Sequence, residues 1–215
     1  MRVEPVTLEG RHVRLEPLSL ERHAEALVAV GLDPDLWRWT IVRVEGAADL
    51  RRYLSTALAE QAAGRALPFA TIERPGGRVV GCTRFMAISD AHRRVEIGST
   101  WIARPWQRTA VNTEAKYLML RHAFESWGCL RVELKTDARN ERSRRAMLRL
   151  GLVEEGTYRK HMVTERGEVR DTVYYSVVDD EWPAVRARLE WLLAGRRSPG
   201  GSPDDAGGVS GSGAR

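Results

Sequence analysis

The sequence predicts a single mixed α/β domain, and three observations support that prediction. Its 215 residues fit one domain of ordinary size. The hydrophobic fraction of 43% is enough for a sizeable core. Segments in which apolar residues alternate, as in strands, are interspersed with segments of helical periodicity. No internal repeat is visible, so we expect one folded body over residues 1–195.

The chain begins with one expected strand and two expected helices. Residues 12–18 alternate, with Val13 and Leu15 on one face, which indicates a strand. Residues 20–30 and 47–63 both show helical spacing of their apolar residues. The order strand, helix, helix therefore opens the domain.

Three antiparallel strands are expected next. The first two, residues 68–73 and 78–88, flank a Pro-Gly-Gly turn, which is a good hairpin signal. The third covers residues 94–102. These strands would form the central part of a sheet.

A wide apolar stripe marks the central helix, residues 112–127, and a stripe of that width belongs against a sheet. The remaining pattern is strand, helix, strand, strand, helix, over residues 130–135, 140–150, 153–163, 169–178 and 181–194. Residues 196–215 are rich in Gly, Ser and Pro, and Val209 is their only large apolar side chain. We expect this segment to be a disordered tail, with a cloning remnant as the alternative.

Composition narrows the class of protein. The formal net charge is +5, yet acidic and basic residues are interleaved, so no basic block favours nucleic-acid binding. No apolar run approaches the roughly 20 residues that span a membrane, and the N-terminus is too charged for a signal peptide. The spacing of Cys82 and Cys129 suits neither zinc nor a disulfide framework. Buried, reduced thiols and a cytoplasmic location are expected.

Two helix starts are candidate anion sites. Residues 107–112 connect a strand to a helix, and the free N–H groups and dipole of a helix N-terminus suit a pyrophosphate. The alternative is a plain turn with Asn112 as the N-cap. A second helix start, marked by Asn140 and Ser143, follows one strand later. Two such termini beside one sheet suit a long phosphate-bearing cofactor such as coenzyme A.

Several linked motifs carry a resemblance to a known family. They are V-E-I-G-S-T-W-I, Q-R-T-A-V-N, N-T-E-A-K, R-V-E-L-K-T-D-A-R-N-E-R-S, L-G-L-V-E-E-G-T-Y-R and R-D-T-V-Y-Y-S. In this order and spacing, residues 3–193 resemble GNAT-superfamily acyltransferases of the RimL/RimJ-like branch, the ribosomal-protein alanine N-acetyltransferases. The resemblance implies a GNAT-like domain with a mixed, largely antiparallel, splayed sheet flanked by helices. It also implies acyl transfer from acetyl-CoA, with succinyl-CoA left open, to a primary amine that attacks directly.

The resemblance also assigns the cofactor site. The family's pyrophosphate loop reads Q/R-x-x-G-x-G/A, and Gln107 fills its first place. Ala110 and Asn112 stand where glycines are usual, although Ala adopts a positive φ at greater cost than Gly. The residues expected to bind the pyrophosphate are Gln107, Arg108, Thr109, Ala110, Val111 and Asn112. Those expected to bind the pantetheine arm are Trp101, Ile102, Ala103, Asn140 and Ser143. Alternatively, the Trp101 side chain has only a packing role, Asn140 is only an N-cap, and Ser143 simply lies in the first turn of the helix.

The catalytic assignments follow from the same resemblance. Ser143 would lie near the sulfur of CoA and donate a proton to the departing thiolate. Many members of the family carry a tyrosine as the general acid four residues further on, but here Met147 occupies that place and cannot donate a proton. Glu96 is the candidate general base. The alternative is a surface carboxylate paired with Arg94 or Arg84. His161 is a second candidate base, and no metal is expected.

Acceptor recognition is the least specific part of the pattern. The connection of residues 32–46 would flank the acceptor and supply the substrate-binding candidates Trp37, Trp39, Arg38 and Arg43. Alternatively, these side chains only cover the sheet. The acceptor would be a protein N-terminus or a small amine. Homodimerisation through the C-terminal strands is left open. The alternative function is a catalytically degenerate CoA-binding protein with a regulatory or assembly role.

Overall fold

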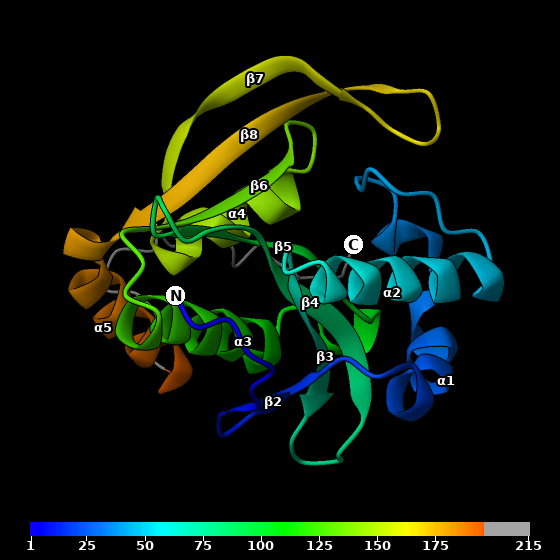
Figure 1. The fold of residues 1–215 in the computed structure, drawn as a ribbon, viewed down its shortest axis with the longest axis horizontal. Helices are drawn as coiled ribbons and strands as arrows, with labels where there is room; N and C mark the ends of the chain where they lie inside the picture. The colour runs from blue at the N-terminus through cyan, green and yellow to red at the C-terminus, as the bar shows by residue number, and fades with distance from the viewer. Residues whose placement is uncertain (196–215) are drawn as a thin grey trace, which may run out of the picture.

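The computed structural model describes residues 1–195 and confirms the single α/β domain. Within these residues, eight strands form one sheet in the order β1-β2-β3-β4-β5-β6-β8-β7, and five α-helices flank it (Figure 1). The predicted tail, residues 196–215, lies outside the described residues. None of the helices within residues 1–195 is long and apolar enough to cross a membrane.

The strands are β1 (Leu8–Glu9), β2 (Val13–Pro17), β3 (Leu67–Glu73), β4 (Val79–Ser89), β5 (Arg94–Ile102), β6 (Arg131–Asp137), β7 (Val153–Val163) and β8 (Val169–Val178). The helices are α1 (Leu20–Gly31), α2 (Ala47–Ala62), α3 (Ala110–Arg121), α4 (Glu141–Leu150) and α5 (Trp182–Leu193). Every helix and strand that the periodicity predicts is present. The short strand β1 was not predicted, because two residues are too few for a periodic signal.

The central helix begins and ends differently from the prediction. Helix α3 starts at Ala110 instead of residue 112, because the hydroxyl of Thr109 caps it by accepting a hydrogen bond from the Val111 N–H at 3.3 Å. Past Arg121 the chain continues as a π-helical turn, His122–Ser126. The apolar stripe continues through this turn, which explains why the pattern predicted one long helix.

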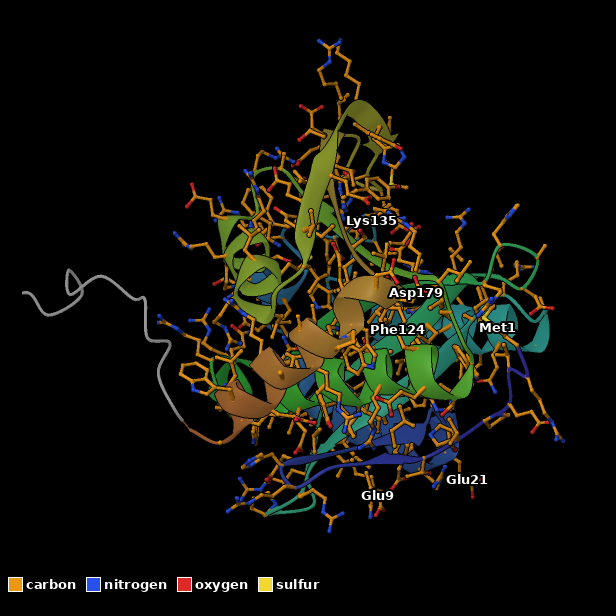
Figure 2. The ribbon with its side chains drawn as sticks, turned by 90° about the vertical axis from the view of Figure 1, so that its left-hand side faces the viewer. Met1, Glu9, Glu21, Phe124, Lys135 and Asp179 are labelled. Carbon is orange, nitrogen blue, oxygen red and sulfur yellow. The ribbon has the colours of Figure 1, made fainter. Side chains whose placement is uncertain are left out.

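The sheet is antiparallel at every junction except one. Strands β5 and β6 run parallel, and all other neighbours in the sheet are antiparallel. Helix α3 makes the crossover between the two parallel strands, as parallel pairs require. Strands β7 and β8 form an arm that rises from the body (Figure 2).

Two hydrophobic cores lie on opposite faces of the sheet. The larger core packs α3, α4 and α5 against the sheet, with Phe85 and Ile97 among the buried strand residues. The smaller core packs α1 and α2 against β3, β4 and β5, with Cys82 and Trp101 among its members. Cys82 and Cys129 are both buried and form no disulfide, as predicted, and burial raises the pKa of each thiol to about 11.

Candidate active site

The sheet opens between its two parallel strands. β5 pairs with β6 only from Arg94–Glu96, opposite Arg131–Glu133. Beyond this point, β5 stays bonded to β4 as far as Ile102, and β6 stays bonded to β8 as far as Asp137. Each strand therefore keeps one backbone edge without a strand partner in the part of the chain that the structure describes. These free N–H and C=O groups can bind an extended, amide-containing ligand.

The chain turns at the end of β5 into the N-terminus of α3. Ile102 and Ala103 are buried, and the Ile102 carbonyl accepts a hydrogen bond from the Gln107 side chain at 2.8 Å. Thr109 caps the helix and also donates its hydroxyl to the Trp106 carbonyl at 2.8 Å. The exposed Arg108 forms no ion pair with any of residues 1–195. The turn therefore presents helix N–H groups and a free guanidinium, a donor set that suits a pyrophosphate.

The backbone of this turn does not need glycine at the two substituted places. Ala110 and Asn112 lie in the first turn of α3, and neither has a positive φ. The left-handed residue is Arg108, with φ of 62°. The cost of a positive φ at Ala110 therefore does not arise in this turn. The Oδ1 atom of Asn112 is buried without a hydrogen-bond partner among the described residues.

A second helix N-terminus lies beside the first. Asn140 caps α4, and its side chain accepts a hydrogen bond from the Ser143 N–H at 3.1 Å. The two termini are linked, because Arg142 donates to the Gln107 side-chain oxygen at 2.8 Å. Ser143 is half-buried, and its hydroxyl forms no hydrogen bond with the described residues. Met147 is buried in the larger core, so its side chain packs α4 against the sheet.

Glu96 lies where β5 and β6 begin to diverge. It is 3% exposed, and it points to the face opposite the core residues Val95 and Ile97. Its Oε2 accepts a hydrogen bond from the Lys135 ammonium at 2.8 Å. Burial raises the pKa of the Glu96 carboxyl above its usual range, and the Lys135 ammonium opposes that rise. Glu96 is thus not a surface carboxylate paired with Arg94 or Arg84.

Lys135 comes from β6 and was not recognised in the sequence. It lies at the base of the β7–β8 arm (Figure 2), and its ammonium is 5.6 Å from the ring centre of Tyr174 on β8. Tyr174 in turn contacts His161, with ring centres 5.8 Å apart. His161 therefore lies on the arm. Lys135 and Tyr174 lie between it and Glu96, the other candidate base.

Comparison with known proteins identifies the family of this chain. The acetyltransferase (GNAT) domain family matches residues 12–153, about two thirds of the chain. This chain belongs to the GNAT acetyltransferase family.

Individual relatives agree with that assignment. YdaF of Bacillus subtilis (strain 168), a candidate ribosomal N-acetyltransferase, is 32% identical over 106 residues; the match covers 49% of this chain and 57% of YdaF. An acetyltransferase structure from T. thermophilus is 40% identical, has a TM-score of 0.81, and is matched over 90% of this chain and all of its own (100%). RimJ of Mycobacterium smegmatis, 23% identical with a TM-score of 0.70, shares the fold over 89% of this chain and 96% of its own.

Two segments far apart in sequence meet where the acceptor is expected to bind. The connection between α1 and α2 contacts the turn between β7 and β8, because the Glu165 N–H donates to the Ile41 carbonyl at 2.9 Å. Arg166 and Arg170 donate to the carbonyls of Trp37 and Trp39, at 3.1 and 3.5 Å. These contacts hold one rim of the site, residues 37–41, against the β7–β8 arm.

The four residues expected to contact the acceptor differ in their exposure. Trp37 is only 1% exposed, and its indole packs against Tyr53 and Trp101, so it belongs to the smaller core. Trp39 is half-buried and stacks with Arg38 at 4.8 Å. Arg38 and Arg43 are exposed, and Arg43 pairs with Glu45 at 2.7 Å. Only Trp39, Arg38 and Arg43 present surface to a ligand.

The residues at the end of β5 face inward. The side chain of Trp101 is 4% exposed and fills the smaller core, which is the packing role also expected for it. Any contact with a pantetheine arm must therefore come from backbone atoms of Trp101, Ile102 and Ala103. Within residues 1–195, no group of three or more His, Cys, Asp or Glu side chains is placed to hold a metal ion.

Proposed function

We propose that this GNAT acetyltransferase transfers the acetyl group of acetyl-CoA to a primary amine, with Glu96 as the general base. The observation that carries the proposal is the position of the Glu96 carboxylate. It lies where β5 and β6 diverge, buried, and held by Lys135 at 2.8 Å. A buried carboxyl with a raised pKa is better matched to accept a proton near neutral pH than an exposed one.

The cofactor would be held by the two helix N-termini and the open strand edges. The N–H groups at the start of α3, together with Arg108 and Gln107, would bind the pyrophosphate. Backbone groups of residues 101–103 and the free amide nitrogen of Asn140 would bind the pantetheine arm. Bound acetyl-CoA supplies a thioester, which activates the acetyl group toward attack by an amine.

The chain's own residues would move two protons. An amine acceptor is an ammonium at neutral pH and must lose a proton before it can attack; Glu96 takes that proton, directly or through water. The new C–N bond forms as the C–S bond breaks. Ser143 gives its hydroxyl proton to the departing sulfur and regains one from the nitrogen, which loses its second proton as the amide forms. The Ser143 hydroxyl suits this role because no described residue engages it.

The acceptor class proposed is a protein N-terminus or a small amine. YdaF, the relative described as a candidate ribosomal N-acetyltransferase, supports a protein N-terminus. The RimJ structure is a complex with CoA-disulfide, which supports CoA as the carrier in this fold. Trp39, Arg38 and Arg43 would contact an extended acceptor at the rim.

The test is turnover with acetyl-CoA and a panel of short peptides and small amines, followed as thiol release. We expect Glu96→Gln to lower kcat by about 10²–10⁴-fold, the usual contribution of a general base. The loss should be largest where the acceptor is an ammonium, and smallest well above the pKa of its amine. Ser143→Ala should lower kcat more than it weakens acetyl-CoA binding.

A matched control separates catalysis from charge removal. Glu25 is a carboxylate on α1 that binds Arg51 on the surface, at 2.8 Å, so Glu25→Gln should leave turnover unchanged. If Glu96→Gln behaves like Glu25→Gln at every pH, Glu96 is not the base. If acetyl-CoA raises the thermal stability of the protein but no amine is acetylated, the non-catalytic CoA-binding role takes precedence.

A further inference from the structure

We propose that Arg84, stacked on Tyr53, binds a carboxylate group of the substrate beside Glu96. The proposal rests on the function proposed above and adds a recognition element to the same site. It predicts that one of the two substrates, the acyl donor or the amine acceptor, carries a negative charge close to the reacting atoms.

Arg84 is a buried cation without a carboxylate partner. It lies on β4, is 7% exposed, and its guanidinium forms no ion pair with any of residues 1–195. Its Nη2 atom is completely buried and unpartnered. The guanidinium lies 4.8 Å from the ring centre of Tyr53 on α2, and the Tyr53 hydroxyl donates to the Ser99 carbonyl at 3.0 Å. The contact with Tyr53 holds the guanidinium in place and leaves Nη2 available to another acceptor.

The carboxylates near Arg84 are engaged elsewhere. On α2, Glu60 is bound in a two-pronged contact by Arg65, at 2.7 and 3.0 Å. On β5, Glu96 is bound by Lys135. Burial of an unpaired charge is costly, and buried charges in proteins are normally paired. A carboxylate of the substrate would form the ion pair with Arg84 that no carboxylate of the described residues forms.

Arg84 and Glu96 share one face of the sheet. Phe85 and Ile97, their neighbours in sequence, point into the larger core, so Arg84 and Glu96 both point to the α2 face. Arg84 is the register partner of Gly98, two residues from Glu96 on the adjacent strand. Diagonal neighbours of this kind lie about 7–8 Å apart.

Gly98 leaves room for the side chains of its neighbours. A Cβ added at Gly98 would lie 2.9 Å from the Glu96 Oε1 atom and 2.9 Å from the Met86 Sδ atom, so both side chains lie over this glycine. A short chain that ends in a carboxylate reaches the guanidinium from the reacting centre when the flexible Met86 side chain moves aside.

The geometry favours a carboxylate because a guanidinium presents parallel N–H groups in a plane, which match its two oxygens. Two sources supply that group: a dicarboxylic acyl chain, as in succinyl-CoA, or an amine acceptor that carries a carboxylate, as an amino acid does. The experiment needs one arm for each source.

Both arms measure binding by calorimetry, with wild type, Arg84→Met and Arg84→Lys. The donor arm compares succinyl-CoA with acetyl-CoA. The acceptor arm uses protein saturated with CoA and compares an amino acid with its amide. In one arm, we expect the wild type to prefer the carboxylate ligand by roughly ten- to hundredfold, the contribution of hydrogen bonds to a charged group. Arg84→Met should abolish the preference, and Arg84→Lys should retain part of it.

The arm that shows the preference identifies the source of the carboxylate. Equal wild-type affinities within both pairs would overturn the proposal, and that comparison needs no variant to fold. An equal loss for every ligand in Arg84→Met would also overturn it, because a structural role predicts that pattern. Arg121→Met is the control: Arg121 also stacks on a tyrosine, Tyr117, at 5.4 Å, but on α3. Binding in Glu96→Gln keeps the Arg84 preference even if turnover is lost, which separates this proposal from the catalytic one.

Discussion

Replacing the buried Lys116 by methionine should stabilise the protein at neutral pH. Lys116 lies on α3, faces the sheet and is 4% exposed. Its ammonium donates to the Thr100 hydroxyl at 2.6 Å and lies 3.4 Å from the Thr83 hydroxyl. No carboxylate of residues 1–195 pairs with it. Burial lowers the pKa of Lys116 from 10.5 to about 7.

The size of the effect follows from proton linkage. Between pH 7 and 10.5 the unfolded lysine binds a proton that the folded one has released, so wild-type stability rises with pH across that window. At about 1.4 kcal/mol per unit, a depression from 10.5 to about 7 destabilises the folded state by roughly 4–5 kcal/mol below pH 7. Methionine removes this penalty and loses about 1 kcal/mol of hydrogen bonding. The hydroxyls of Thr83 and Thr100 remain bonded to each other at 2.7 Å.

The assay is urea unfolding of wild type and Lys116→Met at pH 6, 7.5 and 9. We expect the variant to be more stable by about 3 kcal/mol at pH 6, and this advantage to shrink by roughly 2–3 kcal/mol by pH 9. Other groups titrate equally in both proteins and cancel in the difference. Lys160→Met, at an exposed position on β7, is the control and should show no such slope. A difference that does not change with pH, or a destabilised Lys116→Met at pH 6, would refute the reasoning.

Two further substitutions test the backbone near the site. A Cβ added at Gly81 would overlap the carbonyl oxygen of Trp101, so Gly81→Ala should force β4 and β5 apart and lower stability by about 1–3 kcal/mol, measured by calorimetry. An unchanged Tm of Gly81→Ala would contradict this prediction and show that β4 and β5 can move apart at little cost. Arg108→Gly should raise stability by up to about 1 kcal/mol, because glycine adopts the φ of 62° without strain. The same change should weaken acetyl-CoA binding; a loss of stability would show that the Arg108 side chain supports the turn.

Periodicity predicted the elements of this fold because each one buries a single face. The helix with the widest stripe, α3, was placed correctly in the middle of the chain, but its start was misplaced by two residues. The cause is local: the capping hydroxyl belongs to Thr109, whereas Asn112 offered an equally plausible cap in the sequence. Propensity alone does not decide between two good capping residues three positions apart.

The candidate site was predictable where its residues are contiguous and not where the sheet brings them together. The turn of residues 107–112 and the cap at Asn140 each form one local motif. The pair of Glu96 and Lys135 depends instead on the parallel register of β5 and β6, across 39 residues of sequence. Likewise, Arg84 could be read only as a partner of Glu96, because its stacking on Tyr53 requires α2 to cover β4.

The missing glycines of the phosphate turn bear on whether the chain is an active acetyltransferase or a degenerate one. A glycine is needed where φ is positive or where a Cβ would obstruct a ligand. Ala110 and Asn112 have helical backbones, so the first requirement does not apply to them. The left-handed φ falls on Arg108, whose side chain is exposed. The loss of glycine therefore gives no backbone argument for degeneracy. The question moves to one side chain, Asn112, whose buried Oδ1 lacks a partner among residues 1–195 beside the expected phosphate position.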